Sequence, residues 1–205
     1  MTQLHFKYHE EPWFPEILSY LANRYPAIES RMMNSFRFVQ LHQNNRYAFS
    51  YEFGSILRDT SSVFGSLTDR LVRLTTSGSL PNHLNFGHYR TFLVDNIPDI
   101  PSRTVKVRGL DAGVLVPLSE LGSPQGTPRW WDAYNKLKHS EILNYPDGNL
   151  ENTLNAIGAL AILAFLLGTL GFEMTVSSPL FHNIGIVYPE DSIDVTEKLL
   201  FKKRE

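Results

Sequence analysis

The longest regular pattern in the chain runs from Asn45 to about Thr75, where apolar residues recur with the period of an amphipathic helix. Glu52, Asp59 and Arg70 lie at the boundary between the apolar and polar sides, nearly aligned along the helix axis. The pattern predicts a long helix with one buried face and a charged boundary. The residues expected on the buried face are Phe49, Phe53, Ile56, Leu57, Thr60, Val63, Phe64, Leu67, Leu71 and Leu74.

The segment from Ala156 to Phe172 is apolar on nearly every side. Two structures explain such a segment: a helix at the centre of a bundle, or a membrane span, which needs about 20 residues. The segment is short for a span, contains Gly158, Gly168 and Gly171, and is poor in aromatic residues at its ends, where a bilayer interface would lie. We therefore expect a core helix from Leu150 to Leu170 and no membrane partner.

Shorter helices are expected on either side of the long amphipathic segment. Prolines at positions 12, 15 and 26 interrupt the first 40 residues, which predict an N-terminal arm with one short helix, from Trp13 to Tyr25. A second short helix is expected from Phe86 to Asp95, before the prolines at 98 and 101.

The strand-like segments are few and short. Thr104–Val107 and Gly113–Val116 predict a hairpin near residues 103–117, and we expect one small sheet that unites this hairpin with carboxyl-terminal strands. The predicted fold class is mainly α: a helical bundle over residues 41–172 with a small β-sheet appendage, and a β extension over residues 173–205 packed on the same domain. The expected carboxyl-terminal strands are Phe172–Val176, Ile184–Tyr188 and Lys198–Lys203.

Composition narrows the function classes. With 205 residues and 42% hydrophobic content, the chain has enough material for one good core. Its net charge of −2 gives no global positive field, so any nucleic-acid site has to be a local patch. The absence of cysteine excludes disulfides, thiolate zinc sites and cysteine nucleophiles. Because the start of the chain also lacks the pattern of a secretory signal, we expect a cytoplasmic protein.

The segment that carries candidate chemistry is Pro128 to Leu143, for which we expect a helix with Thr127 as N-cap and Pro128 at the first helical position. On a helical wheel, Trp131, Asn135, Lys138 and Ile142 fall within about 60° of one another, so polar and apolar residues share one face. A buried lysine needs a carboxylate partner, and Glu52 or Asp59 is our candidate. The expected internal polar lock comprises Glu52, Asp59, Asn135 and Lys138, with Trp131 and Tyr134 beside them. Lys138→Ala should then cost roughly 3 to 5 kcal/mol of stability.

These residues also form a short signature. The segment from Trp131 to His139 resembles a W-x-x-Y-N-x-x-K-H signature found in a group of prokaryotic helical proteins. That group of proteins looks related to the HEPN superfamily. The resemblance covers roughly Asn45 to Leu170, and it implies a four-helix bundle, a homodimer, an RNA or protein partner, and a role in phage defence or a toxin-antitoxin system. The matching residues are Trp131, Tyr134, Asn135, Lys138 and His139, followed by Asn152 to Leu160.

Many members of that superfamily cut RNA without a metal, using an arginine, an adjacent polar residue and a histidine on one helix. By resemblance, Asn135 matches the polar position and His139 the histidine, but Tyr134 stands where the arginine is expected. Metal-free cleavage needs a cation to stabilise the charge on the phosphate, and Lys138 or Arg129 would have to supply it. We therefore favour a non-catalytic binding or regulatory module. The alternative is a metal-independent endoribonuclease using His139 and Asn135 at a dimer interface.

Other candidates are weaker. Arg103, Lys106 and Arg108 on the predicted hairpin, with Arg129, are candidates for a phosphate-binding patch, although the usual explanation of such residues is a solvated strand face. No hydrolase, nucleoside-triphosphatase or dinucleotide-binding motif is present, so we expect no cofactor. The spacing of His5 and His9 suits a metal pair, but their position beside Pro12 favours an irregular tail, and we expect no metal site.

Overall fold

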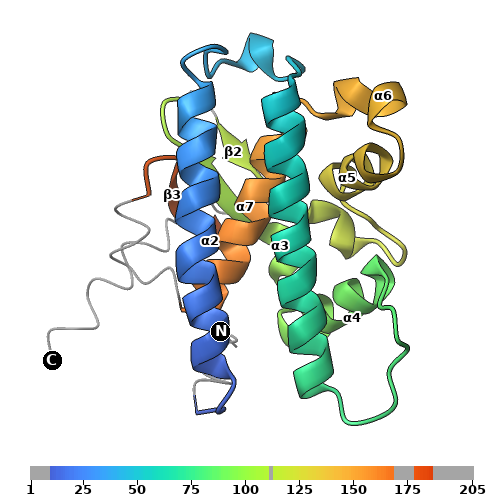
Figure 1. Ribbon diagram of the computed structural model, residues 1–205. Helices are drawn as coiled ribbons and strands as arrows, with labels where there is room; N and C mark the ends of the chain where they lie inside the picture. Colours follow the sequence, from blue (N-terminus) through green and yellow to red (C-terminus); the bar gives the residue numbers. More distant parts are fainter. Residues whose placement is uncertain (1–9, 111–112, 169–177, 187–205) are drawn as a thin grey trace, which may run out of the picture.

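The computed structural model describes residues 10–110, 113–168 and 178–186. In this part of the chain the protein is mainly α-helical with a small antiparallel sheet (Figure 1). The helices are α2 (Phe14–Ser35), α3 (Tyr51–Thr75), α4 (Phe86–Asn96), α5 (Arg129–His139), α6 (Glu141–Asn144) and α7 (Leu150–Leu166). The strands are β1 (Arg103–Val107), β2 (Val114–Leu115) and β3 (Phe181–Ile186), and a short 3-10 turn, η4 (Tyr145–Asp147), leads into α7.

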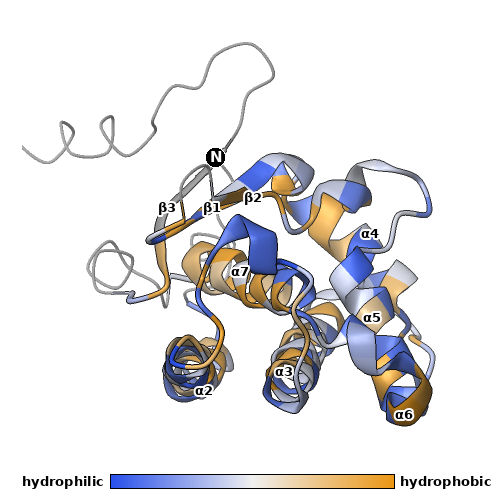
Figure 2. Ribbon diagram, turned by 90° about the horizontal axis from the view of Figure 1, so that it is seen from above, coloured by the Kyte–Doolittle hydropathy of each residue, from blue (hydrophilic) through white to orange (hydrophobic). Residues whose placement is uncertain are grey.

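Helix α7 lies at the centre of the molecule. Seen from above, α2 and α3 lie on one side of it and the sheet on the other (Figure 2), and α7 contacts all of these elements. Its residues from Ala156 to Ala164 are buried, which explains why the sequence is apolar all round. The prediction of a core helix is confirmed, although α7 ends at Leu166 and not at Leu170. Within the described residues, no helix has the length and apolar character needed to cross a bilayer.

Helix α3 buries the face that its periodicity predicts except at its two ends, because Phe49 precedes the helix and is 48% exposed, and Leu74 is only partly buried. Phe53, Ile56, Phe64 and Leu71 are fully buried between α2 and α7 on one side and α5 on the other. The predicted start at Asn45 was wrong, because the side chain of Ser50 accepts a hydrogen bond from the Phe53 N–H and caps the helix there.

Helix α2 is much longer than the short helix expected from Trp13 to Tyr25, because it continues through Pro26 to Ser35. A proline inside a helix costs about 3 kcal/mol, since it removes one hydrogen bond and crowds the preceding turn. Here Pro26 and Ala22 are exposed, so water can satisfy the carbonyl group that the proline leaves free. The apolar stripe continues beyond the proline and holds the helix together through Leu21, Tyr25, Ile28 and Met32, all buried.

The helix expected from Pro128 to Leu143 is divided in two. Helix α5 ends at His139, because Ser140 adopts φ −158° and ψ 82°, and α6 begins immediately afterwards. Pro128 is the residue before the first helical position, so Thr127 is not the cap. The break turns Ile142 out into solvent and separates it from the face of Trp131.

The three strands have the order β2-β1-β3, with both neighbours antiparallel to β1. The predicted hairpin is confirmed, as is its union with a carboxyl-terminal strand, although β3 begins three residues before the expected Ile184. The predicted strands at 172–176 and 198–203 lie outside the described residues, as do His5 and His9.

A buried carboxylate joins α2 to the segment before β3. Glu29, which is 4% exposed, accepts hydrogen bonds from the Ser178 hydroxyl, from the Leu180 N–H at 3.2 Å and from the Tyr25 hydroxyl at 3.4 Å. The guanidinium of Arg108 donates to the Ser178 carbonyl at 2.8 Å. Burial raises the pKa of Glu29, although these hydrogen bonds oppose the effect. The polar cluster therefore fixes the start of β3 against α2.

Candidate functional site

Helix α3, the first turn of α4 and helix α5 enclose a groove of about 700 Å³. Its lining mixes aromatic rings with hydroxyl and amide groups, and its charged residues are two acids and two bases. A groove with this balance suits a ligand that is planar or apolar in part and forms hydrogen bonds, rather than a highly charged one. The lining includes Ser61, Ser62, Gly65, Ser66, Asp69 and Arg70 from α3, Asn85, Phe86 and Tyr89 around the start of α4, and Trp131, Asp132, Tyr134, Asn135 and Lys138 from α5.

Trp131 forms the aromatic centre of this groove. Its ring centroid lies 4.9 Å from that of Phe86, 5.2 Å from that of Tyr134 and 6.0 Å from that of Tyr89. Gly65 on α3 permits this position, because a Cβ atom there would lie 3.0 Å from the edge of the Trp131 ring. The groove wall therefore depends on a glycine that brings the indole close to the α3 backbone.

Helix α5 is held from behind by the neighbouring tryptophan. The indole N–H of Trp130 donates to the Pro117 carbonyl at 2.8 Å, and its ring packs edge-on against Phe64 at 5.3 Å. Leu137 is buried on the same side of the helix. These contacts fix the rotation of α5, so that Tyr134, Asn135 and Lys138 line the groove.

The three predicted catalytic residues do not share one site. Asn135 and Lys138 line the groove, whereas His139 is exposed at the end of α5 and does not belong to the lining. The Lys138 ammonium lies 5.8 Å from the centroid of the Tyr134 ring, a cation–π distance. In the described part of the chain, the side chains of Asn135 and His139 form no hydrogen bond.

A buried hydroxyl lies at the groove on the α3 side. Among the described residues, the Ser61 hydroxyl and the Nε of Arg103 are the buried side-chain groups without a hydrogen-bond partner. Two other buried hydroxyls of α3, those of Thr60 and Thr68, donate to the carbonyl groups four residues earlier. An unsatisfied buried polar group costs about 1–3 kcal/mol, and because Ser61 is 0% exposed, a ligand in the groove would reach its hydroxyl only if neighbouring side chains moved.

One carboxylate at the groove is electrostatically perturbed. Partial burial raises the pKa of Asp132, whereas the nearby Lys136 lowers it and Glu120 raises it further. Asp69, the other acid in the lining, is already paired with Arg73 at 2.7 Å.

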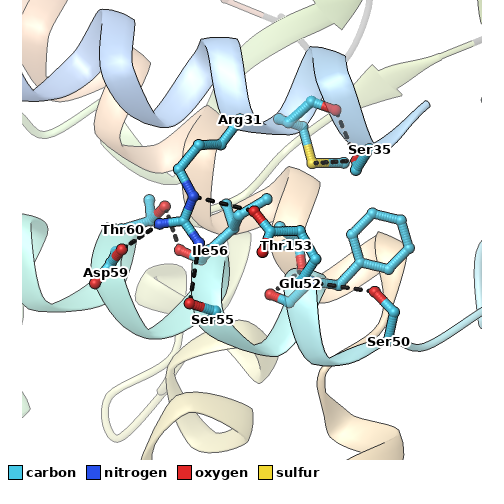
Figure 3. A network of polar contacts seen from close by, with 11 residues as sticks. Arg31, Ser35, Ser50, Glu52, Ser55, Ile56, Asp59, Thr60 and Thr153 are labelled. Carbon is cyan, nitrogen blue, oxygen red and sulfur yellow. Dashed lines mark hydrogen bonds and ion pairs between the residues drawn. The ribbon is translucent and has the colours of Figure 1, made fainter. Parts of the chain in front are cut away.

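The predicted polar lock between α3 and α5 is wrong. Glu52 and Asp59 both face α2, where the guanidinium of Arg31 binds Glu52 at 3.0 Å, contacts Asp59 and donates to the Ser55 hydroxyl at 2.9 Å (Figure 3). Lys138 is exposed and forms no ion pair within the described residues. The physical reason is that Glu52 and Asp59 follow the edge of α3 that adjoins α2, whereas α5 packs along the other edge.

The predicted phosphate-binding patch is also not assembled. Arg103 is buried and binds Asp99 at 2.9 Å, and Arg108 is engaged with the Ser178 carbonyl. Lys106 is exposed on β1, while Arg129 lines a separate hollow of about 370 Å³ that also contains Glu120 and Glu151. Two of the four cations therefore serve the fold, and the other two lie in different surroundings.

Sequence reasoning missed Arg31 and Ser61. Arg31 was assigned to an irregular arm because the proline at 26 ended the predicted helix. Its guanidinium nevertheless contacts two carboxylates, those of Glu52 and Asp59, about two helical turns apart on α3. Nothing in the sequence distinguishes Ser61 from its neighbours Thr60 and Ser62, because its significance comes from burial without a partner.

Comparison of the chain with protein-family models, with curated proteins and with solved structures finds no match.

Proposed function

We propose that this protein is a binding or regulatory module of HEPN-like type, with its ligand site in the groove between α3 and α5. In this proposal α2, α3, α5 and α7 are the four helices of the bundle. The observation that carries it is the Asn135 amide, which forms no hydrogen bond within the described residues, on the wall of a groove centred on Trp131. Polar groups that lack partners beside an aromatic surface are what a binding site presents before its ligand arrives.

The resemblance of the α5 signature directs the first search to RNA. A base that projects from a single strand can stack on an aromatic side chain and offer its edge to an amide, whereas the balanced charge of the groove gives phosphates little attraction. The proposal is therefore one of base recognition in single-stranded RNA, without cleavage.

The endoribonuclease alternative has weaker support. Metal-free cleavage needs the proton-transferring group and the cation around the same phosphate. His139 lies outside the groove lining that contains Asn135 and Lys138. We therefore do not advance this activity, although the experiment below also tests it.

The test uses fluorescein-labelled single-stranded RNA of random sequence, with binding followed by anisotropy in the presence of a chelator. We expect saturable binding that Asn135→Ala weakens about tenfold, as loss of one hydrogen-bonded pair predicts. Asn34→Ala, which removes an exposed amide of α2 outside the groove lining, is the matched control. Absence of binding, or equal binding by the Asn135→Ala protein, would contradict the proposal. RNA cleavage that disappears in His139→Ala would establish the alternative instead.

A further inference from the structure

A hollow of about 370 Å³ lies at the start of α7, and it shares no lining residue with the groove between α3 and α5. We refer to it as the polar hollow, because polar side chains form most of its lining. Its volume falls in the range of about 300–1,000 Å³ that is usual for small-molecule sites. Four separate parts of the chain supply the lining: Tyr47 before α3, the segment after β2, the start of α5 and the first two turns of α7.

Two amides of α7 line the polar hollow with their oxygen atoms unused. The Asn155 amide nitrogen donates to the Glu151 carbonyl at 2.9 Å, and the Asn152 amide nitrogen donates to the Asp147 carbonyl at 3.0 Å. Within the described residues, neither side-chain oxygen accepts a hydrogen bond. Because the two asparagines are three residues apart on one helix, their side chains are neighbours. The polar hollow therefore contains two adjacent acceptors for the hydroxyl or amino groups of a ligand.

The charges of the polar hollow are balanced. Glu151 is neutralised by its ion pair with Arg46. Within the described residues, the Arg129 guanidinium forms no hydrogen bond or ion pair, and the Glu120 carboxylate accepts a hydrogen bond from the Ser119 hydroxyl at 3.2 Å. One cation and one acid of the described lining thus remain available, so the polar hollow favours a ligand without net charge.

The backbone N–H groups at the start of α7 are already used. Those of Leu150, Glu151 and Asn152 all donate to acceptors of the chain itself, each at 2.9 Å. A helix N-terminus binds phosphate or carboxylate groups through N–H groups that are free. An anionic ligand would therefore find Arg129 as the one cation of the described lining, with the Glu120 carboxylate in the same hollow.

Aromatic rings complete the lining. Tyr47 is 67% exposed, and the guanidinium carbon of Arg46 lies over its ring at 5.0 Å from the centroid. The Trp130 ring also lines the polar hollow, but its indole N–H is committed to the Pro117 carbonyl at 2.8 Å. Apolar ring surface next to hydrogen-bonding groups suits a ligand that carries both C–H and hydroxyl groups.

We propose that the polar hollow binds a neutral monosaccharide. Each sugar hydroxyl both donates and accepts, so neighbouring hydroxyls can donate to the Asn152 and Asn155 oxygens and accept from Arg129. Glu120 accepts from a further hydroxyl, and the C–H groups of the sugar ring pack on Tyr47. A free amino acid also lacks net charge, but its carboxylate would find no free N–H group in the first turn of α7. The proposal concerns a site separate from the groove and is independent of what the groove binds.

The first experiment titrates the full chain with glucose, galactose, mannose, ribose and N-acetylglucosamine, each up to about 50 mM, and follows binding by saturation-transfer NMR. We expect saturable binding of at least one sugar, which Asn155→Ala weakens about tenfold through loss of one hydrogen-bonded pair. Asn23→Ala is the matched control, because the exposed Asn23 amide of α2 also donates to the carbonyl four residues earlier, at 2.8 Å. Circular dichroism should show the same melting behaviour for all three proteins.

The second experiment removes the exposed ring, whose loss should not disturb the fold. Tyr47→Ala should weaken binding of the same sugar about threefold, whereas Tyr47→Phe keeps the ring and should bind like the wild-type protein. Absence of saturable binding for all five sugars would overturn the proposal, as would equal binding by the wild-type and Asn155→Ala proteins. Tighter binding of glycine or inorganic phosphate than of any of the sugars would overturn it too, because the polar hollow would then select a charged group.

Discussion

Helix α3 has two polar edges, and its neighbours use them differently. Along the edge that adjoins α2, Arg31 joins Glu52, Ser55 and Asp59, so each of these groups has a partner. Along the edge that adjoins α5, the buried Ser61 hydroxyl has none. The first edge is a closed contact between helices, and the second is an open groove. The comparison teaches that charged residues, which are conspicuous in a sequence, can serve contacts between helices, while an uncharged hydroxyl of the same helix is left without a partner.

The largest effect is expected at Glu29 of α2, a buried carboxylate whose hydrogen bonds are more completely shielded from water than those of Arg31. Glu29→Ala leaves the Ser178 hydroxyl and the Leu180 N–H without their acceptor. Because each buried unsatisfied donor is costly, we expect a loss of about 3 kcal/mol. Urea denaturation followed by circular dichroism measures it. Glu29→Gln keeps an acceptor oxygen and should lose less than half as much.

The same pair of proteins tests the sign of a pH effect. Burial raises the pKa of Glu29 above its ordinary value of 4.5, so the fold favours the protonated form. The stability from this preference is fully present below pH 4.5 and is lost as the pH rises through the raised pKa. We therefore expect the stability of the wild-type protein to fall relative to that of Glu29→Gln as the pH rises from 4.5. A wild-type stability that rises relative to that of Glu29→Gln as the pH rises from 4.5 would show that the hydrogen bonds outweigh burial.

The next largest loss of stability is expected on the edge of α3 that borders the groove. Gly65→Val places a branched side chain where a Cβ alone would lie 3.0 Å from the Trp131 ring. Overpacking of this kind costs about 2 kcal/mol, and the displaced indole should change its fluorescence maximum. Ser66→Val, on an exposed position of the same helix, is the control for β-branching. Equal melting temperatures for the two variants would mean that Gly65 does not set the groove wall.

Substitutions in the contact between α2 and α3 should cost less stability, since the charged groups there are partly exposed. Arg31→Ala should cost about 1 kcal/mol, because solvent screens the two carboxylates that it leaves behind. Arg24→Ala changes an exposed arginine of the same helix and serves as the control. A double-mutant cycle between Arg31 and Asp59 isolates the pair and should give a coupling of about 0.5 kcal/mol. A coupling near zero would leave packing of the arginine stem as its whole contribution.

The smallest effect is expected at Lys138. The sequence led us to expect 3 to 5 kcal/mol for Lys138→Ala through a buried ion pair. Since this lysine is exposed, the expected loss is now within about 0.5 kcal/mol, as for Lys106→Ala. A loss of several kcal/mol would restore the buried pair that the structure contradicts.

These cases show which features of the structure the hydrophobic pattern of the sequence predicts. Periodicity identified most of the buried face of α3, and uniform apolar character identified α7 as a core helix, because both are properties of a single helix. Periodicity did not indicate which neighbour adjoins which edge of α3, so Glu52 and Asp59 were assigned to Lys138 instead of Arg31. The break at Ser140 is a backbone event with no proline or glycine to mark it, and it moved Ile142 off its predicted face.

The position of α7 has a consequence for synthesis of the protein. This most apolar helix follows α2, α3 and β1 in the chain, so these neighbours have left the ribosome before it does, whereas β3 follows it. Domains begin to fold as they are made, and uncovered apolar segments promote aggregation. The order of synthesis thus shortens the time for which the apolar helix α7 is exposed to water. A circular permutant that starts at Asn149 would expose α7 before its neighbours are made, and should aggregate more during synthesis.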